Sequence, residues 1–206
     1  MDLKEALKEF PFIAILRGIK TEEISEAGRI LNKAGFRVIE VPLNSPSPYD
    51  SIQALCQTFG SDILGGAGTV LEVSEVDSVV QAGGKLIVSP NCDPEVIAYA
   101  KACGLVCLPG VATPTEAFNA LKAGADGLKI FPAELVSPSV IKAMKAVLPE
   151  DCMILPVGGI TPSNWHHYTS AGVAGFGLGS ALYKAGMSMD ELAVNAEKFR
   201  ESLGNA

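Results

Sequence analysis

The chain has 206 residues, a net charge of −7 at pH 7 and 48% hydrophobic residues, which suits one domain spanning 1–206. Its 16 Lys and Arg residues are scattered, which argues against nucleic-acid binding, because phosphate backbones attract clustered positive charge. No apolar run is long enough for a membrane span, and the charged, amphipathic start differs from a signal peptide. We therefore expect a cytoplasmic protein that acts on a small molecule.

Short apolar runs alternate with helical patterns along the whole chain. A charged, amphipathic helix is predicted over about 2–9. Eight strand-like runs follow: FIAILR (12–17), FRVIEVPL (36–43), ILGGAGT (63–69), KLIVSP (85–90), LVCLPG (105–110), GLKIFP (127–132), MILPVGG (153–159) and GFGLG (175–179). Because each is short and followed by a helical segment, they are typical of buried parallel strands.

Proline and glycine mark the ends of the predicted helices. Helix starts are indicated at Ser47-Pro48, Asp93-Pro94, Thr113-Pro114, Ser137-Pro138 and Thr161-Pro162. Helix ends are indicated at Gly35, Gly83, Gly104, Gly124 and Gly172. Eight such strand–helix units predict a (β/α)8 TIM barrel whose floor is covered by the N-terminal helix. A doubly wound open sheet also alternates strand and helix, but it gives no reason for eight units.

Three charged side chains lie near predicted strand ends. Alternation places Arg17 on one face with Ile13 and Ile15, Glu40 with Val38, and Lys129 with Phe131. If these faces point inward, Arg17, Glu40 and Lys129 meet at the mouth of the barrel, where such folds build their active sites.

Two interpretations of this convergence compete. A buried ion network would need only balanced charge. Imine chemistry needs an amine, a carboxylate that moves protons and a fixed cation for an acidic substrate, and these three residues supply all of them. A desolvated Lys129 would lose part of its proton affinity and become a nucleophile.

Glycine-rich turns follow the last two predicted strands. Val157-Gly158-Gly159 and Gly179-Ser180 both precede an expected helix start, so their backbone N–H groups could hold a phosphate. Glycine also simply permits tight turns, so each motif alone is weak. Their pairing in the last two units favours a phosphate site.

Further candidates could line the same pocket. Thr69 could bind a carboxylate or merely begin a helix, Phe131 could form a wall or fill the core, and Pro90 could shape the wall or end its strand. His166 and His167 lie away from any strand end, so we interpret them as surface or interface residues. No Cys, His, Asp or Glu pattern has metal-ligand spacing, so we expect neither a metal nor another cofactor.

The chain resembles the KDPG/KHG aldolase family of class I aldolases, which are trimeric (β/α)8 barrels. The resemblance rests on IAILRGI (13–19), VIEVPLNSP (38–46), GAGTVL (66–71), LIVSPN (86–91), LPGVATPTEA (108–117), LKIFPA (128–133), PVGGITPSN (156–164) and GLGSALYKAG (177–186). It implies that Lys129 forms the Schiff base and Glu40 is the general acid/base. It also implies that Arg17 and Thr69 bind the substrate carboxylate and that the glycine turns bind its phosphate.

Two departures bear on the substrate. Many gluconate-specific members have Arg-Thr where this chain has Asn44-Ser45, and Thr where it has Val157. These differences favour cleavage of the galactonate epimer of a phosphorylated 2-keto-3-deoxy sugar acid, giving pyruvate and glyceraldehyde 3-phosphate. The family resemblance also implies a homotrimer. The alternatives are the gluconate or 4-hydroxy-2-oxoglutarate activity of the same family, or a phosphosugar-binding barrel without turnover.

Overall fold

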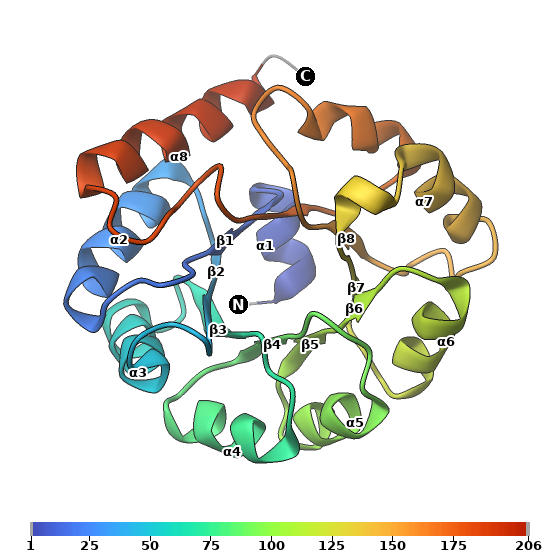
Figure 1. Ribbon diagram of the computed structural model, residues 1–206, viewed down its shortest axis with the longest axis horizontal. Helices are drawn as coiled ribbons and strands as arrows, with labels where there is room; N and C mark the ends of the chain where they lie inside the picture. The colour runs from blue at the N-terminus through green and yellow to red at the C-terminus, as the bar shows by residue number, and fades with distance from the viewer. Residues whose placement is uncertain (1, 205–206) are drawn as a thin grey trace.

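The computed structural model describes residues 2–204. A curled parallel sheet occupies the middle of the molecule, and helices are arranged around its outside (Figure 1). The strands are β1 Phe12–Ile15, β2 Val38–Pro42, β3 Leu64–Gly68, β4 Leu86–Val88, β5 Val106–Leu108, β6 Gly110–Val111, β7 Leu128–Ile130, β8 Ile154–Pro156 and β9 Phe176–Leu178. Each lies within a segment that the sequence predicted as a strand, except that β6 extends one residue beyond its segment.

Helices alternate with the strands along most of the chain, beginning with a helix before β1. They are α1 Leu3–Glu9, α2 Thr21–Ala34, α3 Pro48–Phe59, α4 Val73–Gln81, α5 Pro94–Ala102, α6 Pro114–Lys122, α7 Pro138–Lys145 and α8 Met189–Leu203, with short 3-10 helices η1 Ala133–Leu135 and η2 Trp165–Ala171. None of the helices within the described residues is long and apolar enough to cross a membrane.

The strands form two parallel sheets, one with the order β5-β4-β3-β2-β1-β9 and one with the order β6-β7-β8. The predicted α/β class with a curled parallel sheet is confirmed. The sheet differs from the single closed ring that we expected, because the fifth predicted strand is divided at Pro109, which has no backbone N–H to donate. Its first half, β5, pairs with β4, and its second half, β6, pairs with β7.

Most predicted helix boundaries agree with the structure. α3, α5, α6 and α7 each begin at the proline of their predicted start. A capping box forms at the start of α6, where Thr113 Oγ1 accepts from the Glu116 amide at 3.3 Å and Glu116 Oε2 accepts from the Thr113 amide at 2.9 Å.

The predicted helix start at Thr161-Pro162 is wrong. A turn follows instead, and η2 begins only at Trp165. The Asn164 side chain fastens this turn, because its Oδ1 accepts from the Thr161 amide and its Nδ2 donates to the Gly159 carbonyl, both at 2.8 Å. The Asn164 and Trp165 amides both donate to the Thr161 carbonyl, so the backbone makes a single turn before η2.

Helix α1 covers one end of the sheet, as predicted. In Figure 1 it lies in the centre of the ring of helices. Its Leu3, Ala6 and Leu7 are buried against side chains that the strands point inward. These inward residues are Ile13, Val38, Leu64, Leu86, Val88, Leu108 and Leu155. Because apolar side chains fill this end, the charged groups gather at the opposite end.

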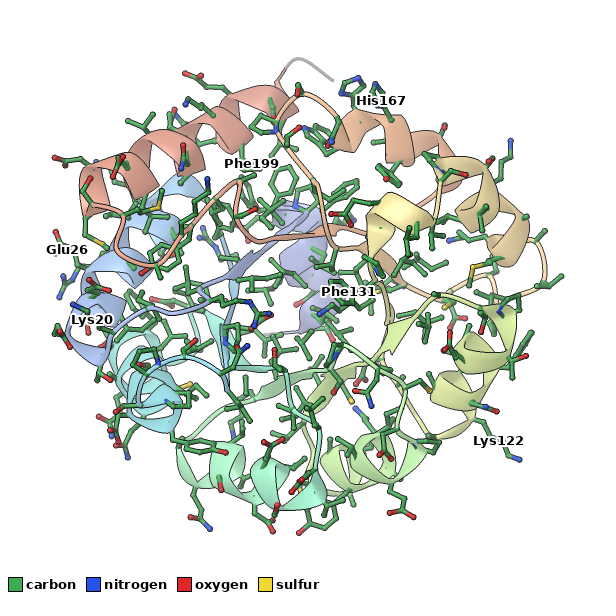
Figure 2. The ribbon with its side chains drawn as sticks, in the orientation of Figure 1. Lys20, Glu26, Lys122, Phe131, His167 and Phe199 are labelled. Carbon is green, nitrogen blue, oxygen red and sulfur yellow. The ribbon has the colours of Figure 1, made fainter. Side chains whose placement is uncertain are left out.

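A second, larger core lies between the strands and the helices. At its centre the Phe12 ring of β1 contacts the rings of Phe199 and Trp165, with centroids 5.3 and 5.6 Å away. Figure 2 shows Phe199 pointing from α8 toward the interior, whereas His167 lies on the outer rim, as the sequence indicated. The aromatic cluster therefore joins the first strand to the last helix.

Candidate active site

A cavity of about 850 Å³ opens at the C-terminal ends of the strands. Its lining comprises Ile15, Arg17, Gly18, Lys129, Phe131, Glu134, Val157, Gly158, Gly159, Ile160, Thr161, Gly179, Ser180, Ala181, Tyr183, Lys184 and Ala185. Most of the residues that the sequence singled out therefore line one cavity. Three do not line it: Glu40 and Thr69 adjoin it through their contacts with other site residues, and Pro90 has no recorded contact with the site.

Lys129 is held in the middle of β7 by its backbone. It pairs in register with Gly110 and Leu155, and its amide donates to the Pro109 carbonyl at 2.9 Å. Its side chain is buried, and its Nζ lies 4.8 Å from the centre of the Phe131 ring. Burial lowers the pKa of the Lys129 amine, with the Glu40 charge acting in the opposite direction. Burial therefore favours the neutral, nucleophilic amine.

Glu40 is buried in β2 next to two glycines of β3. It pairs with Gly66, and a Cβ on Gly68 would overlap its carboxylate, so the missing side chains of β3 make room for it. Desolvation raises the pKa of Glu40 to about 7, although the charges of Lys129 and Arg17 lower it. Its Oε2 has no hydrogen-bond partner among the described residues.

Lys129, Glu40 and Arg17 converge without forming ion pairs. They influence one another electrostatically, yet no nitrogen of Lys129 or Arg17 lies within 4.0 Å of a Glu40 oxygen. Ion pairs of the described chain, such as Lys101–Asp126, lie elsewhere. A network that served only to balance charge would bring its partners into contact. This arrangement instead leaves space between an amine and a carboxylate.

Arg17 follows β1 and donates hydrogen bonds to two neutral side chains. Its NH1 donates to Asn44 Oδ1 at 2.5 Å and its NH2 to Thr69 Oγ1 at 3.5 Å. Thr69 has a φ of +58°, a left-handed conformation that is uncommon for a β-branched residue. The turn after β3 thus aims the Thr69 hydroxyl at Arg17 in a backbone state that tends to occur at functional sites.

The two glycine turns line one side of the cavity. Gly158 and Gly159 have φ values of +115° and +63°, so the turn after β8 needs residues without a Cβ. Within residues 2–204, the amides of Gly159, Gly179 and Ser180 donate to no protein acceptor. Such groups of free N–H donors can bind an anion.

Neither turn leads directly into a helix. The first turn is separated from η2 by the Asn164 hydrogen bonds, and α8 begins only at Met189, well after Ser180. The dipole of an α-helix therefore does not contribute at either turn, and an anion bound there would be held by backbone amides.

Several cavity residues were not identified from the sequence. Glu134 of η1 packs against the Gly158–Gly159 turn, where an added Cβ would meet its carboxylate. Tyr183 and Lys184 reach the cavity from the loop after β9. These three residues follow predicted strands closely, which is the position where a barrel builds its site. No sequence pattern distinguished them from ordinary surface residues.

No group of three or more His, Cys, Asp or Glu side chains in residues 2–204 could hold a metal ion. The cavity contains an amine, a glycine-rich turn and a cation, with the Glu40 carboxylate beside it. Together these groups can form and stabilise a covalent bond to a carbonyl compound that carries acidic groups at both ends.

Comparison with known proteins agrees with this chemistry. The family model described as KDPG and KHG aldolase matches residues 3–196. The chain belongs to the KDPG and KHG aldolase family. Within this aldolase family, two relatives share 48% identity with it. The probable 2-dehydro-3-deoxy-6-phosphogalactonate aldolase of Rhizobium meliloti matches over 91% of this chain and 89% of its own length. The 2-dehydro-3-deoxy-6-phosphogalactonate aldolase of Escherichia coli matches over 93% of each.

Solved structures of the same aldolase family are similar throughout. One described as native KDPGal has 47% identity and a TM-score of 0.93, with 96% of each chain covered. The KDPG aldolase of Legionella pneumophila, with pyruvate captured as a covalent carbinolamine, has 26% identity and a TM-score of 0.81. The alignment covers 98% of this chain and 96% of that one.

The raised pKa of Glu40 predicts a pH-dependent stability. The carboxyl has a pKa of about 7 in the folded chain, against 4.5 for an unperturbed glutamate. Between these values the folded chain keeps a proton that the unfolded chain releases, so the free energy of unfolding falls as the pH rises. Glu40→Gln has no carboxyl at this position, so its free energy of unfolding should not fall for this reason. We therefore expect the free energy of unfolding of Glu40→Gln minus that of wild type to increase by about 2–3 kcal/mol from pH 5 to pH 8.

Urea denaturation of both proteins at the two pH values measures this difference. Glu22→Gln, which removes an exposed carboxylate of α2, is the control for the loss of one charge. A stability difference between Glu40→Gln and wild type that did not change with pH would contradict the raised pKa.

Proposed function

We propose that this protein is a class I aldolase that cleaves 2-dehydro-3-deoxy-6-phospho-D-galactonate to pyruvate and D-glyceraldehyde 3-phosphate. The observation that carries the proposal is the buried Lys129 amine, which lies near a carboxylate but forms no ion pair with it. The names of the two relatives at 48% identity support the same substrate.

Lys129 would begin the reaction as the nucleophile. Its neutral Nζ attacks the C2 ketone of the substrate, and the carbinolamine loses water to form an iminium ion. The pyruvate carbinolamine captured in the Legionella pneumophila relative is the corresponding adduct on that protein. Burial supports this role, because it lowers the pKa of the amine.

Glu40 would move the protons. Directly or through a water molecule, its carboxylate takes the proton of the C4 hydroxyl while the C3–C4 bond breaks and its electron pair passes to the iminium. Glyceraldehyde 3-phosphate leaves and an enamine remains. Glu40 then returns the proton to C3, and water hydrolyses the imine to pyruvate and free Lys129. A pKa of about 7 suits a carboxylate that accepts and donates a proton near neutral pH.

The ends of the substrate would be fixed by two anion sites. Arg17 and Thr69 hold the C1 carboxylate, and the turns at Gly158–Gly159 and Gly179–Ser180 hold the distal phosphate through their free amides. Holding both ends places the scissile bond between Lys129 and Glu40. The remaining predicted residues, Phe131, Val157 and Pro90, would form walls, although only Phe131 and Val157 line the cavity.

The finer architecture belongs to the same proposal. We infer one domain over residues 1–206 whose two sheets complete a (β/α)8 barrel. The division at Pro109 lies within one predicted strand, and a parallel bridge between Val157 and Gly177 links the end of β8 to β9. Because the strands are short, few residues are available to pair between the two sheets. We also retain the cytoplasm as the expected location.

The substrate epimer is assigned from the residues near C4. Val157 is buried at the cavity wall and presents no hydroxyl there, and the segment after β2 carries Asn44 in place of the Arg of many gluconate-specific relatives. A site that hydrogen-bonds one hydroxyl can reject the other arrangement strongly, and this chain lacks that donor at Val157.

Borohydride trapping tests the nucleophile. Incubation with pyruvate and borohydride should add one reduced pyruvate to Lys129, detected by mass spectrometry of the digested protein. Lys129→Met keeps the apolar stem, and we expect it to fold, to remain unlabelled and to lose cleavage activity by roughly a thousandfold or more. Lys85→Met, at an exposed lysine before β4, is the control and should be labelled normally. Absence of label from wild type would show a binding protein, and label on another lysine would reject the mechanism.

Substrate preference tests the epimer assignment. We expect wild type to cleave the galactonate epimer at least as efficiently as the gluconate epimer, as measured by kcat/KM. Val157→Thr adds a hydroxyl without changing the size of the side chain, and it should shift the ratio toward gluconate. Trapping of pyruvate should be unchanged in this variant, because pyruvate has no C4. A strong gluconate preference in wild type would leave the aldolase mechanism but remove the galactonate assignment.

A homotrimer is the proposed assembly. Large apolar side chains are exposed on several elements, among them Phe118 of α6, Leu135 of η1, Val140 of α7 and Val147 just after it. Leu135 is 80% exposed, which is unusual for a leucine that has no partner to cover it. We expect light scattering to give three times the 21.5-kDa chain mass at micromolar concentration. A stable monomer under these conditions would contradict the trimer.

A further inference from the structure

Asn44 contacts the candidate active site, but the mechanism above gives it no role. Its Oδ1 accepts a 2.5 Å hydrogen bond from Arg17 NH1. We infer that Asn44 is a positioning residue that orients Arg17 toward the substrate carboxylate without neutralising its charge. The inference rests on the proposed role of Arg17 and adds a determinant of carboxylate affinity.

The backbone around Asn44 is tied to its surroundings on both sides. The Leu43 amide donates to the Gly68 carbonyl at 2.8 Å, and Ser45 Oγ accepts from the Gly18 amide at 2.9 Å. Ser45 is itself buried. The segment after β2 is thereby fastened to β3 and to the residue that follows Arg17. Asn44 is therefore fixed relative to the backbone of Arg17.

The guanidinium needs such support because Arg17 is exposed and its side chain is long. An unsupported arginine loses much rotamer freedom when it binds a ligand. Asn44 and Thr69 accept from different terminal nitrogens, NH1 and NH2, so they fix the plane of the guanidinium. A guanidinium has five N–H donors, and those not used here remain for a carboxylate.

The neutrality of both acceptors matters for binding. A carboxylate at position 44 could bind the same nitrogen with similar shape, but it would compensate the charge that attracts the substrate. Among the described residues, the ion pairs recorded for arginines involve Arg37 and Arg200 and not Arg17. The Arg17 charge thus stays uncompensated by a direct partner while its geometry is held.

Two substitutions separate geometry from charge. Asn44→Ala removes the acceptor, and Asn44→Asp keeps an oxygen at the same place but adds a negative charge. The measurement is the pyruvate concentration that gives half-maximal borohydride trapping on Lys129. We expect Asn44→Ala to raise it roughly tenfold, the scale of one hydrogen bond to a charged group. Asn44→Asp should raise it further, because the new carboxylate competes with pyruvate.

The chain offers a matched control far from the cavity. Asn32 Oδ1 accepts from Arg37 NH1 at 2.6 Å, which is the same kind of Asn–Arg contact. Asn32→Asp makes the same chemical change at α2, and it should leave the pyruvate dependence unchanged. Circular dichroism and thermal melting of all variants show whether each is folded; Asn44 is exposed, so its substitution should not disturb the core.

A double-mutant cycle tests whether Asn44 acts through Arg17. In an Arg17→Met background, Asn44→Ala should have no further effect on pyruvate trapping. A full additional effect would overturn the inference, as would a wild-type pyruvate dependence in both Asn44 variants. Failure of the proposed function looks different, because wild type itself would then not be trapped at Lys129.

Discussion

Lys129 and Glu40 are buried close together without touching, and this constraint governs the arrangement around them. Each charged form loses hydration, and direct contact would recover part of that cost by Coulomb attraction. The structure instead shifts both pKa values toward the neutral forms. In the free protein, Lys129 and Glu40 therefore stay apart, and both are shifted toward their neutral forms. Burying them without direct contact is unfavourable, so packing elsewhere in the fold must offset that free energy.

The fold keeps its apolar side chains at one end of the strands and its charged site residues at the other. At one end, α1 closes the sheet with Leu3 and Leu7 against inward aliphatic side chains. At the other end, the glycines of β3 leave the volume that the Glu40 carboxylate occupies. A bulkier residue at Gly68 would displace this carboxylate, so the absence of a side chain there is as necessary to the site as the charges themselves.

Much of this arrangement could be predicted from the sequence. Two-residue alternation in the strand-like runs placed Arg17, Glu40 and Lys129 at one mouth, because the register of buried parallel strands allows few alternatives. Features near the cavity that depend on hydrogen bonds between particular side chains could not be predicted from the alternation of apolar and polar residues. A turn fastened by Asn164 takes the place of an expected helix start, and the contact between Asn44 and Arg17 joins residues far apart in sequence. Pro90 ends its strand as predicted, but its position does not reach the cavity.

The aromatic cluster around Phe12 has a consequence for how the chain is made. Phe12 belongs to the first strand, whereas Trp165, Phe176 and Phe199, which pack around it, come from the last quarter of the sequence. During synthesis on the ribosome, the first strand emerges long before the residues that cover it. A growing chain therefore lacks the rings that pack on this side of β1 until the segments that carry them have emerged, so this part of the core forms late.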